Sequence, residues 1–210
     1  MKQNTFLYVL RLALTLLIIT SIMAAALAVV NRMTHSRIRE NTDEKRGKAV
    51  AAVMTEGDYI LFDTNNVRHQ LQTDLPEGIV GAYRGINGPL VEGDTYPSNF
   101  TGETAVEVVV PGFDGEITMM VGIDADGKVL GISIISHTET AGLGAVAAAD
   151  NAKGQAFRDQ FIGMSGSLAV TKDGGEVDAI TGATITSRAV TRGVNQALEF
   201  YEYLREQGIW

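Results

Sequence analysis

An almost uninterrupted run of apolar residues extends from Leu12 to Val30 near the start of the chain. A run of about 20 such residues is long enough to cross the hydrocarbon core of a bilayer as a helix. We therefore expect a transmembrane anchor over residues 1–35 and a charged, alanine-rich connecting helix over residues 36–56. A cleaved secretory signal is the alternative, but the run is longer than the core of a usual signal, which favours an uncleaved anchor.

Three segments in the middle of the chain alternate between apolar and polar residues, which is typical of half-buried strands. They cover residues 105–111, 116–124 and 128–136, and glycine-containing turns separate them. This arrangement predicts an antiparallel meander. The expected core residues of its first two strands are Val106, Val108, Val110, Ile117, Met119 and Val121. Residues 75–102 are rich in Gly and Pro, which predicts surface loops with short strands.

A different periodicity appears towards the C-terminus, where apolar residues recur at steps of three and four. This spacing predicts an amphipathic helix with one buried face. That face comprises Val190, Val194, Ala197, Leu198, Tyr201 and Leu204. Residues 168–171 are expected to form a last short strand before the helix. Together these patterns predict an α+β domain over residues 57–210, in which helices pack on an antiparallel sheet.

The segment over residues 178–187 reads Asp-Ala-Ile-Thr-Gly-Ala-Thr-Ile-Thr-Ser and lies where the terminal helix is expected to begin. One of the hydroxyls of Thr184, Thr186 and Ser187 is expected to cap this helix. The free N–H groups and the positive end of the helix dipole favour an anion there, such as a phosphate. Gly182 and Ala183 would let a bulky ligand approach the backbone closely. A capped helix without any ligand remains the alternative on these residues alone.

A second polar, glycine-rich segment follows the last strand of the meander directly. It covers residues 137–144 and reads His-Thr-Glu-Thr-Ala-Gly-Leu-Gly. Loops at strand ends that carry polar side chains are common places for functional sites. His137 and Glu139 could form an acid–base pair, and Glu139 could accept a hydrogen bond from a ligand. A solvated turn is the alternative for these residues taken one by one.

Composition excludes several kinds of chemistry. The net charge of -8 argues against a nucleic-acid partner, for which a basic face is expected. The chain has no Cys, which excludes disulfides, Cys-ligated iron–sulfur clusters and c-type haem attachment. Its three His residues, His35, His69 and His137, are too widely separated to favour a zinc site. If the protein carries out redox chemistry, an organic cofactor must supply it.

Both polar segments resemble elements of one known family, the FMN-binding domain proteins. Residues 178–184 are similar to the family motif Asp-x-x-(Ser/Thr)-Gly-Ala-(Thr/Ser). Residues 137–144 are similar to its His-x-Glu-Thr-Pro-Gly-Leu-Gly element, with Ala141 in place of the usual Pro. The two elements occur in the expected order, so together they are much more specific than either alone.

The resemblance implies that FMN is attached through its phosphate to a hydroxyl side chain. In this family a flavin transferase uses FAD as the donor and esterifies the last residue of the motif, which is Thr184 here. No residue is expected to be catalytic or to bind a metal. The expected cofactor-binding residues are His137, Glu139, Thr140, Gly142, Leu143, Asp178, Thr181, Gly182, Ala183, Thr184, Thr186 and Ser187.

Within this family the chain most resembles the G subunit of Rnf complexes, which are ion-translocating ferredoxin:NAD oxidoreductases. The C subunit of the Na⁺-pumping NADH:quinone reductase is related but has larger additions. The resemblance implies an electron carrier whose partners are other membrane subunits, membrane lipid and, during maturation, the transferase. It also implies a single-pass protein of the cytoplasmic membrane with its N-terminus inside and its domain extracytoplasmic. A stand-alone exported FMN carrier and a non-redox anchored binding domain are the alternatives.

Overall fold

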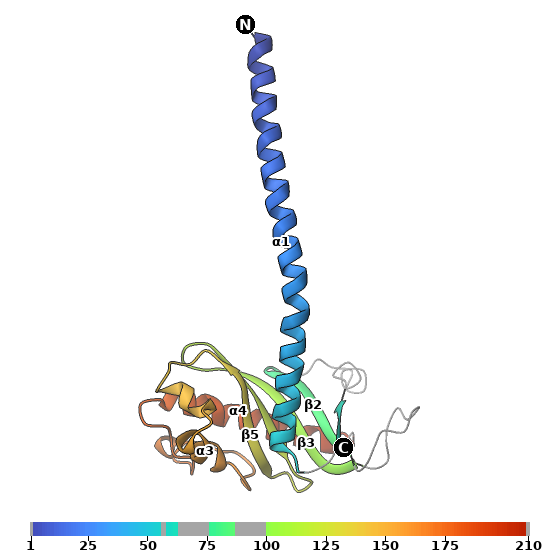
Figure 1. The fold of residues 1–210 in the computed structure, drawn as a ribbon. Coiled ribbons are helices and arrows are strands. Elements are labelled where there is room, and N and C mark those ends of the chain that lie inside the picture. Colours follow the sequence, from blue (N-terminus) through green and yellow to red (C-terminus); the bar gives the residue numbers. More distant parts are fainter. Residues whose placement is uncertain (1, 56–57, 63–75, 87–99, 209–210) are drawn as a thin grey trace. The chain divides into compact units, whose positions relative to one another are not determined.

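The computed structural model describes residues 2–55, 58–62, 76–86 and 100–208 (Figure 1). The chain divides into two compact units, Met1–Lys45 and Arg46–Trp210. The helix α1, Lys2–Val53, forms the first unit and enters the second. Among the described residues one stretch, Leu7–Arg32, is long and apolar enough to cross a membrane, and it belongs to α1. The expected domain boundaries at residues 35 and 56 remain predictions.

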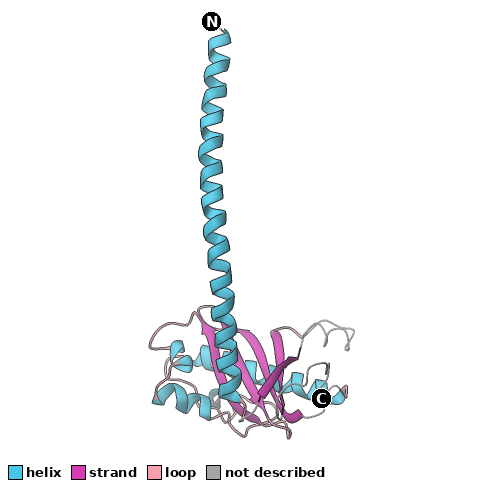
Figure 2. Cartoon of the chain, turned by 45° about the vertical axis from the view of Figure 1, so that its right-hand side comes forward, coloured by secondary structure: helices cyan, strands magenta, loops and turns pink. Residues whose placement is uncertain are grey.

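Within the described residues the second unit contains a five-stranded antiparallel sheet, whose strands follow one another in chain order (Figure 2). The strands are β1 Asp58–Phe62, β2 Ile79–Ile86, β3 Phe100–Pro111, β4 Glu116–Ile123 and β5 Val129–His137. The predicted meander corresponds to β3, β4 and β5 and is confirmed. The strand β2 lies in the region expected to be mostly loops, and it forms because Ile79, Ala82 and Ile86 are buried.

Both faces of the sheet are buried, although the alternation pattern predicted only one buried face. The predicted core residues of β3 and β4 are all buried on the first face. On the other face Met120 packs with Val50 and Val53 from the last turns of α1. This close approach requires glycine in β4, since a Cβ atom added to Gly122 would lie 1.9 Å from the carbonyl oxygen of Val53. The sheet is thus enclosed between two layers of helix.

The terminal helix α4, Thr184–Glu206, packs on β3 and β4 (Figure 1). All six residues of its predicted apolar face are buried, which confirms that prediction. The expected strand at residues 168–171 is wrong, because Val170 forms only an isolated bridge to Val177. The 3₁₀ helix η2, Thr171–Asp173, begins immediately afterwards. This turn becomes part of the site described below.

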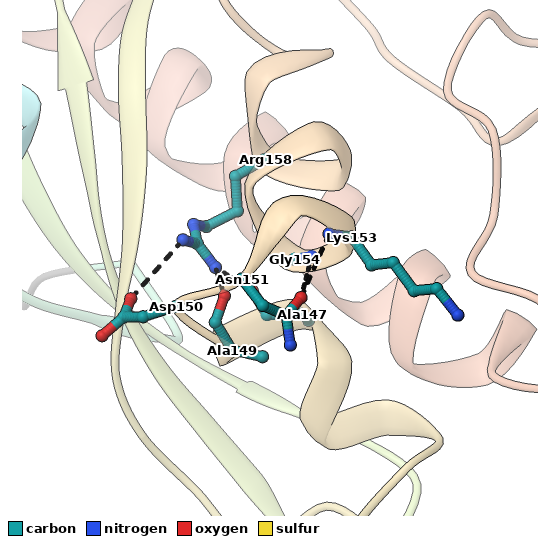
Figure 3. A network of polar contacts seen from close by, with 7 residues as sticks. All are labelled: Ala147, Ala149, Asp150, Asn151, Lys153, Gly154 and Arg158. Carbon is teal, nitrogen blue, oxygen red and sulfur yellow. Dashed lines mark hydrogen bonds and ion pairs between the residues drawn. The ribbon is translucent and has the colours of Figure 1, made fainter.

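A polar network fixes the segment between β5 and α4 (Figure 3). The 3₁₀ helix η1, Gly144–Ala148, is followed by α3, Ala152–Asp159. Asn151 caps α3 by accepting hydrogen bonds from two backbone N–H groups of its first turn, each at 3.0 Å. Arg158 donates to the carbonyl oxygens of Ala147 and Ala149 at 2.8 and 3.1 Å. The loop that enters η1 is therefore supported on its C-terminal side.

Candidate functional site

A cavity of about 300 Å³ lies where three segments of the second unit meet. These are the turn between β3 and β4, the loop after β5 and the start of α4, and a lysine from η2 completes the wall. The cavity is lined by Phe113, Glu139, Thr140, Leu143, Gly144, Lys172, Gly182, Ala183, Thr184, Ile185 and Thr186. The fold thus gathers into one cavity residues that lie far apart in the sequence.

Thr184 is the first residue of α4, is half-buried and lies on the cavity wall. Its hydroxyl oxygen accepts a hydrogen bond from Lys172 Nζ at 2.9 Å. The N-cap position is Ala183, and in the described part of the chain no side chain caps the helix. The expectation of a hydroxyl cap is therefore wrong. Because the first N–H groups of a helix have no intrahelical acceptor, this uncapped end favours an anion.

The two neighbouring hydroxyls, Thr186 and Ser187, are buried and already engaged. Thr186 Oγ1 donates to Glu139 Oε2 at 2.5 Å. Ser187 Oγ donates to the carbonyl oxygen of Ala183 and accepts from the N–H group of Ile180, both at 3.0 Å. These contacts explain why neither hydroxyl caps the helix. They also leave Thr184 as the accessible hydroxyl among the three.

Glu139 joins the three segments that form the cavity. Its side chain is buried, with 7% of the residue exposed. One carboxylate oxygen accepts from the N–H groups of Phe113 and Asp114 at 2.7 and 3.2 Å, and the other accepts from Thr186. Glycine makes room for this carboxylate, since a Cβ atom on Gly144 would lie 2.3 Å from Glu139 Oε2. Glu139 therefore holds the β3–β4 turn and the start of α4 together.

The surroundings of Glu139 keep its carboxylate ionised. Burial raises the pKa of Glu139, but the hydrogen bonds from Thr186, Asp114 and Phe113, together with the charge of His137, outweigh burial and lower the pKa below its ordinary value. His137 contacts the Glu139 backbone, because its Nδ1 atom accepts from the Glu139 N–H group at 3.2 Å. The carboxylate itself is thus a buried acceptor at the base of the cavity.

The structure brings seven of the twelve expected cofactor-binding residues to this cavity. They are Glu139, Thr140, Leu143, Gly182, Ala183, Thr184 and Thr186. Gly142, Asp178 and Thr181 line a neighbouring cavity of about 390 Å³. Ser187 supports the turn before α4, and His137 lies at the end of β5. Asp178 is positioned through its backbone, whose N–H group donates to Gln160 Oε1 at 2.7 Å.

Four lining residues, Phe113, Gly144, Lys172 and Ile185, were not among the expected cofactor-binding residues. Phe113 belongs to a Gly-Phe-Asp-Gly turn, whose pattern suggested only a structural role. Lys172 carries no local signal, because it reaches Thr184 from a turn twelve residues earlier. Among the described residues, no group of three or more His, Cys, Asp or Glu side chains is placed to hold a metal ion.

Known proteins resemble this chain over most of its length. The FMN-binding domain model matches residues 112–199, a range that contains every residue of the cavity wall. The chain is 34% identical over 204 residues to the G subunit of the Na⁺-translocating ferredoxin:NAD⁺ oxidoreductase complex of Acetobacterium woodii. The match covers 93% of each chain. This chain belongs to the G-subunit family of ion-translocating oxidoreductase complexes.

Other members of the G-subunit family come from different bacteria. The chain is 31% identical over 205 residues to the G subunit of the ion-translocating oxidoreductase complex of Pseudomonas aeruginosa, covering 94% of this chain and 91% of that protein. It is 39% identical over 137 residues to the G subunit of the proton-translocating ferredoxin:NAD⁺ oxidoreductase complex of Clostridium ljungdahlii, covering 62% and 71%. Relatives named for sodium and for proton translocation thus both match this chain.

A solved structure of the C subunit of the Na⁺-translocating NADH-quinone reductase of Parabacteroides distasonis also matches this family member. The TM-score is 0.48 at 18% sequence identity, and the match covers 80% of this chain and 95% of that chain.

Proposed function

We propose that this chain is an FMN-carrying electron-transfer subunit of an ion-translocating ferredoxin:NAD⁺ oxidoreductase complex, with FMN ester-linked through its phosphate to Thr184. The observation that carries the proposal is the state of the three hydroxyls at the start of α4. Thr184 opens into the cavity beside Lys172, whereas Thr186 and Ser187 are buried and engaged. The motif suggested Thr184, and the packing supports the same residue by a separate argument.

The two ends of the cavity fit the two ends of FMN. The phosphate end would lie at the uncapped N-terminus of α4, where Lys172 and the helix dipole supply positive charge. Phe113, Leu143 and Ile185 line the same cavity and are unusually exposed for apolar side chains, with 64% of Phe113 accessible. An aromatic ring system would cover these side chains and remove their apolar surface from water.

The attachment step is a group transfer from FAD. Thr184 Oγ1 forms a bond to the flavin-side phosphorus of FAD, and the bond from that phosphorus to the AMP phosphate breaks. AMP leaves with the electron pair, and a base of the flavin transferase takes the hydroxyl proton. When bound, FMN supplies one- and two-electron transfer chemistry that this chain's side chains lack. The chain itself binds the phosphate, orients the ring and retains the cofactor.

Mass spectrometry of protein that is produced with a flavin transferase tests the proposal. The peptide that contains Thr184 should gain one FMN phosphoryl ester in the wild type and in Ser165→Ala, which changes an exposed hydroxyl outside the cavity. The ester should be absent from Thr184→Ala. An unmodified wild-type peptide would contradict the proposal, provided that another acceptor protein is loaded in the same cells.

We further propose that the N-terminus is cytoplasmic and that the domain lies on the extracytoplasmic face. The chain contains no Cys, so a single introduced cysteine reports sidedness without interference. Ser165→Cys, at an exposed position of the domain, should react with a membrane-impermeant maleimide in intact cells. Labelling only after the membrane is permeabilised would reverse the proposed orientation.

A further inference from the structure

The turn that carries Lys172 is held in one position against α4. Asp173, the next residue, accepts two hydrogen bonds from the Arg188 guanidinium, both at 2.6 Å. Hydrogen bonding from Arg188 lowers the pKa of Asp173 below its ordinary value, so this pair stays ionised in mildly acidic solution. The Thr171 N–H group also donates to the carbonyl oxygen of Val177 at 2.8 Å. The lysine therefore extends from an anchored turn.

From this turn the Lys172 ammonium reaches one hydroxyl, that of Thr184, at 2.9 Å. Its contact occupies a lone pair of Thr184 Oγ1 and leaves the hydroxyl hydrogen free. Within the described residues the Thr184 hydroxyl donates to no protein acceptor, whereas Ser187 and Thr191 both donate to the carbonyl oxygen four residues earlier. A proton acceptor brought by another protein would therefore find the Thr184 proton available.

We propose that Lys172 is the positioning cation of flavin attachment: it orients Thr184 for attack, pairs with the phosphate that becomes esterified, and is itself placed by the Asp173–Arg188 ion pair. This inference rests on the proposed function, because it concerns the same transfer from FAD. Lys172 gives up no proton in that step. Its charge stabilises the negative charge that develops on the phosphate oxygens during attack and remains on the diester.

The test compares full-length protein variants in detergent with a purified flavin transferase and FAD. The rate of FMN incorporation is followed by intact mass for the wild type, Lys172→Gln, Lys172→Arg and the control Lys128→Gln, which changes an exposed lysine outside the cavity. Loss of one charge-assisted hydrogen bond should lower kcat by roughly tenfold or more in Lys172→Gln. Lys172→Arg should recover most of the rate, and Lys128→Gln should match the wild type.

The separation of kcat from KM distinguishes positioning from docking. A lysine that orients the hydroxyl lowers kcat and leaves KM for the acceptor protein nearly unchanged. A rise in KM at constant kcat would overturn the proposal, because Lys172 would then serve transferase binding. Wild-type loading at Thr184 with an equal rate in Lys172→Gln would also overturn it and leave the proposed function intact. Failure of wild-type loading would instead contradict the proposed function.

A double-mutant cycle tests the role of the ion pair. Arg188→Gln should slow incorporation several-fold in the wild-type background, because the turn that carries Lys172 loses its anchor. The same substitution should have almost no further effect in Lys172→Gln. Equal effects in both backgrounds would show that Arg188 acts independently of Lys172. Once loaded, the wild type and Lys172→Gln should also differ in the ³¹P chemical shift of the phosphodiester, and identical shifts would exclude the phosphate contact.

Discussion

Two regions of the second unit each bury a glutamate, and they stabilise its charge in different ways. Under the last turns of α1, Glu107 is 3% exposed, and Arg46 Nε lies 3.0 Å from both of its carboxylate oxygens. Beside the start of α4, Glu139 is held by two backbone N–H groups and one hydroxyl. The first carboxylate joins a helix to the sheet, whereas the second shapes a cavity.

This difference separates stability from function. The donors to Glu139 belong to the segments that line the cavity, so a change at Glu139 should alter both the stability of the unit and FMN attachment. The partner of Glu107 lies on α1, which packs on the face of the sheet opposite α4. A change there should lower stability alone. Variants at the two glutamates test that contrast, and the largest effect is expected at Glu139.

Replacement of Glu139 by alanine should have the largest effect. Two N–H groups and the Thr186 hydroxyl lose their acceptor, which should lower the free energy of unfolding by about 3 kcal/mol. FMN incorporation should also fall sharply, because the turn carrying Phe113 is no longer tied to α4. Urea unfolding monitored by tyrosine fluorescence and intact mass measure the two effects. An unfolding midpoint equal to that of the wild type would refute the role assigned to this carboxylate.

Replacement of Arg46 by methionine should lower the unfolding free energy by about 2 kcal/mol. The loss is below that of a fully buried pair, because one third of the arginine side chain is exposed. FMN incorporation should remain at the wild-type rate when measured well below the unfolding midpoint. A parallel loss of incorporation would break the comparison, since it would couple the α1 side of the sheet to the cavity.

Two glycines provide a matched pair with similar costs in stability. In Gly144→Ala the new methyl group would meet Glu139 Oε2 at 2.3 Å and Thr186 Oγ1 at 2.5 Å, which should cost about 1–2 kcal/mol and slow attachment. Gly163 has φ +80° and open space around it, so Gly163→Ala should cost about 1 kcal/mol through backbone strain alone. Attachment should be normal in Gly163→Ala. Equal attachment rates in both variants would argue against steric protection of the Glu139 carboxylate.

The smallest effect should be on pH dependence. The pKa of Glu139 is lower in the folded protein than its ordinary value of 4.5, so the folded state binds this proton less readily than the unfolded state. Its stabilisation is fully present above the ordinary pKa and is lost as pH falls through the lower folded pKa. The stability difference between the wild type and Glu139→Gln should therefore be constant near neutrality and shrink below that range. A difference that grows on acidification would reverse the sign.

Local patterns were sufficient for much of the fold. The alternation in β3 and β4 and the spacing of Val190, Val194 and Leu198 depend on neighbours within one element, so the strands and α4 could be predicted. The second buried face could not, because it depends on where Val50 and Val53 pack. The short strand predicted near Val170 failed because its bridge to Val177 leads directly into a 3₁₀ turn.

The sequence by itself determined the apolar run, the meander, the amphipathic terminal helix and the hydroxyl-rich segment, because each depends on composition or on a short period along the chain. Only the tertiary structure decided which hydroxyl remains accessible and which cation reaches it. Glu139 contacts Thr186 across 47 positions and Phe113 across 26, and Lys172 contacts Thr184 across 12. Such pairings are set by how the sheet places its turns beside α4, and no local spacing encodes them.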